Sequence, residues 1–231
     1  QTVISDYMVR MMIIDTEKKC LTRSDKRAER TRKKLESAAL EVFTEYGLDA
    51  TTIEDITQRA DLGKGTFYRH FKDKEEIATI LVDLAIEELL ERLRTPEKQI
   101  RTLSEAIEHL LEAHYRFFLE EYEKFILLFQ GRLLVKLERR ISEKMEGPYT
   151  RYLCEMESVL SPFIGEKIDP TKIRRLSCAV AGFVFGFFSF AMIGMELEQV
   201  ESSIQPLRQS FVRSLSGATT CHDLAVLGSF T

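Results

Sequence analysis

Apolar residues recur at intervals of three and four along most of this chain, a spacing that places them on one face of an α-helix. In the first part the pattern predicts a helix closed by Gly47, a second from about Ile53, a third over residues 64–70 and a fourth from about Asp73. After Thr95 it predicts helices over the ranges 97–121, 122–144, 148–161, 170–195 and 201–216. No strand pattern or internal repeat competes, so the sequence predicts an all-α fold.

Capping residues mark the start of the second helix. Thr52 is followed three positions later by Asp55, and Thr51 by Glu54, so either pair fits a capping box. In such a box the hydroxyl and the carboxylate satisfy backbone N–H groups that the first helical turn leaves unpaired. We therefore expect a short helix to begin near Ile53.

The residues that follow predict a tight turn and a second short helix. Asp61, Leu62 and Gly63 form the turn, because Asp tolerates the left-handed backbone region and Gly adopts it readily. The helix over residues 64–70 turns Phe67 inward and leaves its polar side exposed. Two short helices joined in this way form a helix-turn-helix, whose second helix fits the major groove of DNA.

These residues resemble the TetR (tetracycline-repressor-like) family of bacterial transcription regulators, from about Arg30 through Lys74. The family pattern of Gly, Thr, an apolar residue, Tyr, His, Phe and Lys is matched by Gly65, Thr66, Phe67, Tyr68, His70, Phe71 and Lys74. Two residues depart from the pattern: Asp61 replaces a common Gly, and Gly63 replaces a Ser that often caps the second helix of the helix-turn-helix. We call this second helix, expected over residues 64–70, the reading helix. The resemblance implies an N-terminal three-helix DNA-binding domain and a C-terminal helical domain that binds a ligand and dimerises. The expected domain ranges are an extension over 1–24, the DNA-binding domain over 25–73, the C-terminal domain over 74–217 and a tail over 218–231.

The resemblance also divides the DNA-binding residues into two groups. Donors to the DNA backbone would be Thr52, Tyr68, His70 and Lys74. Residues at or near base edges would be Lys64, Gly65, Thr66 and Arg69. Hydroxyl, imidazole and ammonium donors bind phosphate without reading sequence, whereas Lys and Arg can pair with guanine acceptors. A single surface cation is usually only solvated, but the whole set on one short helix favours DNA contact.

Two further residue sets follow from the resemblance. A seam of small residues with two apolar residues of the last helix predicts a homodimer interface: Cys178, Gly182, Gly186, Ser189, Leu207 and Phe211. An aromatic set predicts a pocket for a hydrophobic or aromatic effector: Tyr115, Phe118, Tyr122, Phe125, Phe129, Tyr152, Phe183 and Phe187. For each aromatic residue taken singly, ordinary core packing is the simpler interpretation.

Charge and composition restrict the classes of function that the chain can have. The net charge is −4, yet basic residues outnumber acidic ones in residues 1–74. A basic run at the start of the first predicted helix can follow a DNA backbone: Lys26, Arg27, Arg30, Arg32, Lys33 and Lys34.

The four Cys and four His show no metal-ligand spacing, and no nucleotide-binding or nucleophile motif occurs, so we expect no metal, no cofactor and no enzyme activity. Scattered Cys and the lack of a signal-peptide pattern in residues 1–21 predict a cytoplasmic protein.

The segment from Cys178 to Met195 is nearly uncharged and rich in Phe, and its length is at the lower limit for a membrane span. A buried helix of a soluble domain has the same composition, and charged residues flank this one, so we interpret it as a core helix buried on every side. The sequence thus predicts a dimeric, DNA-binding transcription regulator, a repressor released from its operator by a small effector. The alternatives are a single-span membrane-anchored helical protein and an all-helical enzyme.

Overall fold

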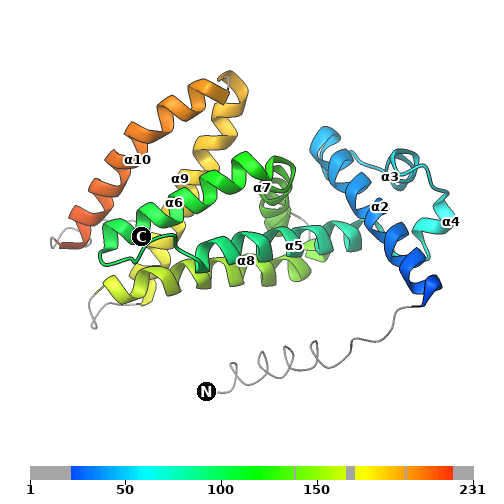
Figure 1. Cartoon of the computed structure of the whole chain (residues 1–231), viewed down its shortest axis with the longest axis horizontal. Helices are drawn as coiled ribbons and strands as arrows, with labels where there is room; N and C mark the ends of the chain where they lie inside the picture. The colour runs from blue at the N-terminus through cyan, green and yellow to red at the C-terminus, as the bar shows by residue number, and fades with distance from the viewer. Residues whose placement is uncertain (1–21, 138, 165–169, 196, 221–231) are drawn as a thin grey trace, which may run out of the picture.

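The structure, a computed structural model, describes residues 22–137, 139–164, 170–195 and 197–220. Across these ranges the chain forms α-helices and a 3₁₀ turn, and contains no strand. Figure 1 shows α2, α3 and α4 gathered at one end of the molecule, with the remaining helices making up the rest. The all-α prediction is confirmed, whereas the predicted extension and tail fall largely outside the described residues.

Helices α2 and α3 are separated by a loop whose ends are both fixed by caps. Helix α2 (Arg23–Tyr46) stops at Gly47, whose φ of 88° lies in a region that disfavours side chains. Helix α3 (Ile53–Arg59) begins after Thr52, whose hydroxyl accepts a hydrogen bond from the Asp55 N–H at 3.2 Å. The Asp55 carboxylate accepts from the Thr52 N–H at 2.8 Å, so this capping box is confirmed.

The alternative box of Thr51 with Glu54 is wrong. Thr51 is buried, and its hydroxyl donates to the Gly47 carbonyl at 2.7 Å instead of accepting from the helix. This hydrogen bond therefore joins the two ends of the loop that precedes the Thr52 cap.

The turn before the reading helix uses one left-handed residue, Asp61, with a φ of 49°. Gly63 has a φ of −83°, so the expectation that it also needs the left-handed region is wrong. Helix α4 (Lys64–Phe67) is shorter than the predicted range of 64–70. The remaining residues continue as a tighter turn, in which the His70 N–H donates to the Phe67 carbonyl at 2.8 Å.

Helix α5 (Lys74–Arg94) joins the three-helix group to the rest of the molecule (Figure 1). It begins after Asp73, whose carboxylate accepts from the Glu76 N–H at 2.7 Å. It packs against α2 and against three further helices: α6 (Leu103–Glu120), α7 (Tyr122–Leu137) and α8 (Arg139–Leu160). One helix thus contributes to the cores of both parts.

Several predicted boundaries are wrong for identifiable reasons. Residues 97–102 are not helical, because Thr102 caps α6 by accepting from the Glu105 N–H at 3.2 Å. Helix α8 begins at Arg139 and runs through the buried Pro148, which the sequence suggested as a first helical residue. The last helix, α10 (Leu197–Thr220), extends into the predicted tail and packs against α6.

The helical spacing of apolar residues predicts that Tyr46 and Leu84 lie on buried helix faces, but both are exposed. Tyr46 is 53% exposed at the end of α2, where Gly47 turns the chain away. Leu84 is 54% exposed because it follows the buried Val82 by two positions, which places it on the opposite side of α5.

Helix α9 (Pro170–Gly194) is buried on one side only, so the prediction of burial on every side is wrong. Val180, Val184 and Phe188 face the core, whereas Phe190 is 77% and Ile193 81% exposed. By length and composition alone, the segment Thr171–Ala191 is apolar enough to cross a membrane, and a third of its window is buried. A core helix of a soluble protein passes the same test, so this feature is weak evidence for a membrane span.

A buried histidine joins three of the C-terminal helices. His114 on α6 lies with its Nδ1 2.6 Å from the Leu110 carbonyl and its Nε2 2.7 Å from the Tyr152 hydroxyl of α8. Nδ1 therefore carries the proton, and Nε2 accepts from the tyrosine. The ring of Phe185, on α9, lies edge-on to the imidazole. Burial lowers the pKa of His114 to about 4.

This pKa predicts a pH-dependent stability. Below its ordinary pKa of 6.5 the histidine becomes charged in the unfolded chain but stays neutral in the folded protein down to about pH 4. The free energy of unfolding should therefore fall as the pH drops through this window, by up to about 3 kcal/mol. Urea unfolding of the protein and of His114→Gln at pH 7, 5.5 and 4.5 measures it. Gln keeps a donor and an acceptor but does not titrate, so its stability should depend less on pH; equal pH dependence would contradict the assignment.

Candidate nucleic-acid interface

Helix α4 is held by one buried side chain and presents the others to solvent. Phe67 is fully buried and its ring lies 5.6 Å from that of the buried Phe71. Tyr68, the next residue, is 58% exposed. Gly63 at the N-cap provides no side-chain hydrogen bond, as the departure from the family pattern led us to expect. The helix therefore depends on its phenylalanine anchor for its position.

The residues expected near base edges lie together on this exposed side. Lys64 forms an ion pair with Glu54 of α3, and both side chains are about half exposed. The Arg69 guanidinium donates to the Gly65 carbonyl at 3.3 Å and to the Thr66 hydroxyl at 3.0 Å. A Cβ built on Gly65 would meet no atom within 4 Å, so this side of the helix is bare. Both cations are thus accessible, and each is oriented by a neighbour.

Three of the residues expected at the DNA backbone have exposed or half-buried side chains, although the single hydroxyl proton of Thr52 is already used within the protein. Thr52 is exposed at the start of α3, where its hydroxyl donates to the Asp55 carboxylate at 2.6 Å. Tyr68 is exposed, and His70 is half-buried beside the Phe71 ring. These side chains leave room for another molecule to approach.

Lys74 does not fit its expected role. Its ammonium donates to the carbonyls of Leu48 at 2.7 Å, Asp49 at 3.0 Å and Thr51 at 2.8 Å. An ammonium has three N–H donors, so all of them are used inside the protein. In this geometry no donor remains for a phosphate oxygen, and the expected direct phosphate contact is not supported.

Most of the basic run on α2 is solvent-exposed, with one exception. Lys26, Arg27 and Arg30 are exposed. Arg32 is instead half-buried, bonded to Glu36 at 2.9 Å and lying 5.1 Å from the centre of the Phe71 ring. It therefore contributes to packing beneath the reading helix rather than to the cationic surface.

The predicted effector residues separate into groups. Tyr115, Phe118, Phe125 and Tyr152 are buried and meet Phe185 and Phe188 of α9, with Phe118 and Phe188 stacked at 4.2 Å. We call these six residues the aromatic cluster. Phe183 stacks instead on Phe211 of α10 at 4.3 Å, with Phe187 beside it. Tyr122 is 44% exposed, and Phe129 lies under the Arg132 guanidinium.

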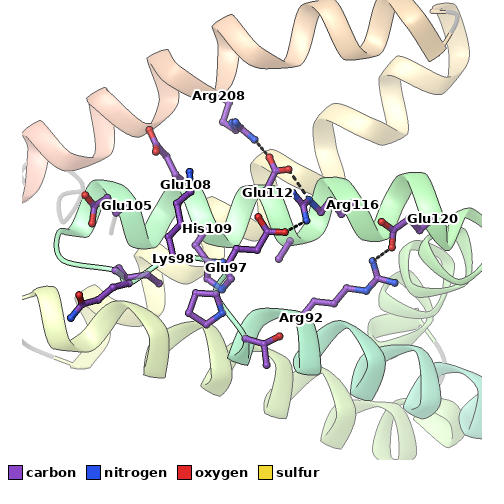
Figure 2. Close-up of a pocket in the computed structure, with 15 residues that line it drawn as sticks. Arg92, Glu97, Lys98, Glu105, Glu108, His109, Glu112, Arg116, Glu120 and Arg208 are labelled. Carbon is purple, nitrogen blue, oxygen red and sulfur yellow. Dashed lines mark hydrogen bonds and ion pairs between the residues drawn. The ribbon is translucent and has the colours of Figure 1, made fainter.

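A surface pocket of about 700 Å³ opens elsewhere, between the end of α5, the segment 95–100, α6 and α10. Figure 2 shows that its lining is mostly charged, and none of the predicted effector residues contributes. Arg116 pairs with Glu97 and Glu112, and Arg208 of α10 pairs with Glu112 (Figure 2). One of these ion pairs joins α10 to α6, and another joins the segment 95–100 to α6. No group of three potential metal ligands occurs in the described part of the chain.

The predicted dimer seam is open in the single chain. Cys178 and Gly182 are exposed, and Gly186 and Ser189 are half-buried. A Cβ on either glycine would meet no atom within 4 Å, so none of the described helices covers the seam at these two positions. Leu207 of α10 is 47% exposed, whereas Phe211 is half-buried against Phe183.

Comparison with known proteins identifies the helix-turn-helix. Residues 36–79 match the model of a family described as bacterial regulatory proteins, tetR family. The HTH-type transcriptional regulator TcmR of Streptomyces glaucescens is 31% identical over 139 residues, which cover 56% of this chain and 62% of that protein. The chain therefore spans less than two thirds of this relative.

Solved structures show the same fold along most of the chain. Salmonella enterica GusR superposes with a TM-score of 0.66 at 18% identity, covering 87% of this chain and 99% of that one. FadR of Bacillus subtilis, solved in complex with stearoyl-CoA, has a TM-score of 0.65 at 20% identity and covers 79% and 96%. The predicted arrangement, an N-terminal helix-turn-helix domain followed by a C-terminal helical domain, is confirmed.

Proposed function

Because the chain belongs to the tetR family of bacterial regulatory proteins, we propose that it is a sequence-specific DNA-binding transcription regulator. The observation that carries the proposal is helix α4, which buries Phe67 and exposes Lys64, Gly65, Tyr68 and Arg69 at the end of the molecule. A helix presented in this way fits the major groove, which is about 12 Å wide. The expected boundary between the two domains falls at Asp73, the cap of α5.

Within this proposal one group of residues contacts the base edges and another contacts the DNA backbone. Lys64, Gly65, Thr66 and Arg69 lie at base edges, because they share the exposed side of α4. Tyr68 and His70 donate to the backbone, and the exposed cations of α2 add sequence-independent attraction. Thr52 lies at the same surface, but its one hydroxyl proton is used by Asp55 in this geometry.

We further propose that the protein is a cytoplasmic, non-enzymatic repressor that a hydrophobic or aromatic effector releases from its operator. The buried aromatic cluster supports an apolar effector, since these rings supply the apolar surface on which such a molecule binds. FadR, which shares the fold, is solved with a fatty acyl-CoA.

A homodimer completes the proposal. One short helix reads only a few base pairs, so two copies on adjacent half-sites multiply the specificity. The exposed apolar side of α9, with the open glycine seam and Leu207 of α10, is a surface that a second copy covers.

Base reading predicts a change in sequence preference. Selection from a random DNA pool should yield one preferred sequence for the wild type and an altered one for Lys64→Ala or Arg69→Ala, because each bidentate pair with guanine discriminates by about 1–3 kcal/mol. Tyr68→Phe is the control: it loses one backbone donor and should bind all sequences more weakly with the same preference. Unaltered selection by both alanine variants would show that neither cation reads bases.

The bare side of α4 predicts that Gly65 serves close approach of the DNA. Gly65→Ala should leave the fold intact, and helix propensity alone favours it by up to about 1 kcal/mol, since its Cβ meets nothing in the chain. Affinity for the selected sequence should fall, because the methyl group enters the space of the duplex. Thermal unfolding and a DNA titration measure the two effects separately, and full affinity at unchanged stability would contradict the close approach.

The exposed side of α9 predicts the oligomeric state. Phe190→Glu should convert dimers to monomers in sedimentation velocity while leaving the helical spectrum intact, because this side chain is 77% exposed in the single chain. Leu84→Glu, on the exposed side of α5, is the control and should remain dimeric. A dimeric Phe190→Glu variant would place the interface elsewhere.

A further inference from the structure

The loop between α2 and α3 receives several of its hydrogen bonds from side chains of two other helices. Its residues 47–52 lie between a helix end and a helix start, where backbone groups have no partner within a helix. Leu48 and Thr51 are buried there, so their unpaired backbone groups would cost free energy if left without partners. The loop therefore needs partners supplied by side chains.

Lys74, the first residue of α5, supplies the donors. Its ammonium binds the carbonyls of Leu48, Asp49 and Thr51, all within 3.0 Å. Hydrogen bonds from a charged donor are stronger than neutral ones. A lysine suits this position because its three donors diverge from one atom and meet three carbonyls of a curved loop.

Gln130 of α7 holds the same peptide segment from the other side. Its Oε1 accepts from the Leu48 N–H at 3.2 Å, and the side chain is half-buried between α7 and the loop. Leu48 is thus bonded through its N–H to α7 and through its carbonyl to α5. We call Lys74, Gln130 and the Leu48 backbone the loop clamp.

The clamp acts directly on the reading surface. The loop ends at Thr52, which caps α3, and α3 carries Glu54, the ion-pair partner of Lys64 on α4. A displacement of the loop relative to α5 and α7 therefore changes the direction of α3 and, with it, that of α4. Because α5 and α7 belong to the C-terminal part, the clamp sets the reading helix relative to that part.

We propose that Lys74 and Gln130 are positioning residues for DNA binding, which hold the α2–α3 loop in the orientation that α4 needs and do not contact the DNA backbone. This inference rests on the proposed function, since it concerns how the same reading helix is placed. It replaces the phosphate contact that the sequence suggested for Lys74.

Lys72 provides a matched control two residues away. It is exposed, and its ammonium has no ion pair or hydrogen bond to the described residues. It lies just before the N-terminus of α5, where a phosphate is favourably placed. Lys72→Met and Lys74→Met thus remove the same charge from nearly the same place, but only the second breaks the clamp.

The experiment measures DNA affinity at several salt concentrations, using the sequence selected by the wild-type protein. A direct phosphate contact contributes about 0.9 to the slope of log affinity against log salt. Lys74→Met should bind about tenfold more weakly with the wild-type slope, because broken charged hydrogen bonds misplace the helix without removing a phosphate contact. Lys72→Met should reduce the slope. A slope reduced equally by both variants would overturn the proposal.

Variants of Gln130 give independent evidence. Gln130→Leu should weaken binding at an unchanged slope, whereas Gln130→Glu, which keeps an acceptor for the Leu48 N–H, should restore it. Since both residues act on one loop, Lys74→Met combined with Gln130→Leu should cost less than the product of the single effects. Wild-type affinity in Gln130→Leu, or strictly multiplied effects, would contradict a shared clamp.

Lys74→Arg keeps the test decisive if Lys74→Met does not fold. A planar guanidinium cannot direct its donors to these three carbonyls, but it binds phosphate well. Weakened binding at an unchanged slope supports the clamp, and full affinity overturns it. Failure of the proposed function has a different outcome: the wild-type protein itself would then show no salt-dependent preference for any DNA sequence.

Discussion

A helix of four residues has too few hydrogen bonds to be stable alone in water, so α4 exists only because the rest of the chain holds it. Phe67 and Phe71 supply this support by burying two rings from a segment of five residues. Arg32 covers the Phe71 ring from α2, and Asp61 turns the chain into the helix through the left-handed region. These contacts bury both phenylalanine rings, and the polar side of the same short segment is left to the solvent.

Helix α5 connects this support to the larger part of the molecule. Its first turn is fixed by Asp73 and by the hydrogen bonds of Lys74 to the α2–α3 loop, and its later residues form part of the C-terminal core. Ion pairs also tie it to its neighbours, as between Arg151 of α8 and Glu87, and between Lys124 of α7 and Glu88. These pairs are partly exposed, so each contributes little to stability.

The sequence predicted what depends on local chemistry. The Thr52 cap, the Gly47 stop, the left-handed Asp61 and the burial of Phe67 follow from residue types at fixed spacing, and the structure has all of them. Spacing does not determine the direction of a long flexible side chain. Lys74 and Arg32 were therefore expected at a DNA surface, although loop carbonyls and an aromatic ring from distant segments use their charges.

Residues whose role comes from distant partners were missed for the same reason. Gln130 is an ordinary polar residue on an apolar helix, and its contact with Leu48 crosses 82 positions of sequence. His114 belongs to no recognisable motif, and its role depends on burial and on the Tyr152 hydroxyl, which keep it neutral. The open side of α9 was predicted as a seam of small residues, but helical spacing does not distinguish a side covered by the same chain from one left bare.

Helix α7 contributes residues to both the aromatic cluster and the loop clamp. It carries Phe125 in the aromatic cluster and, little more than one turn further along, Gln130 at the loop clamp. A helix is stiff over this length, so a shift or rotation of α7 that accommodates a change among the packed rings also moves the acceptor of the Leu48 N–H. Since hydrogen bonds weaken steeply with distance and angle, a small movement is enough to weaken this one. The same helix that packs against the aromatic cluster is thus hydrogen-bonded to the loop that orients the reading helix.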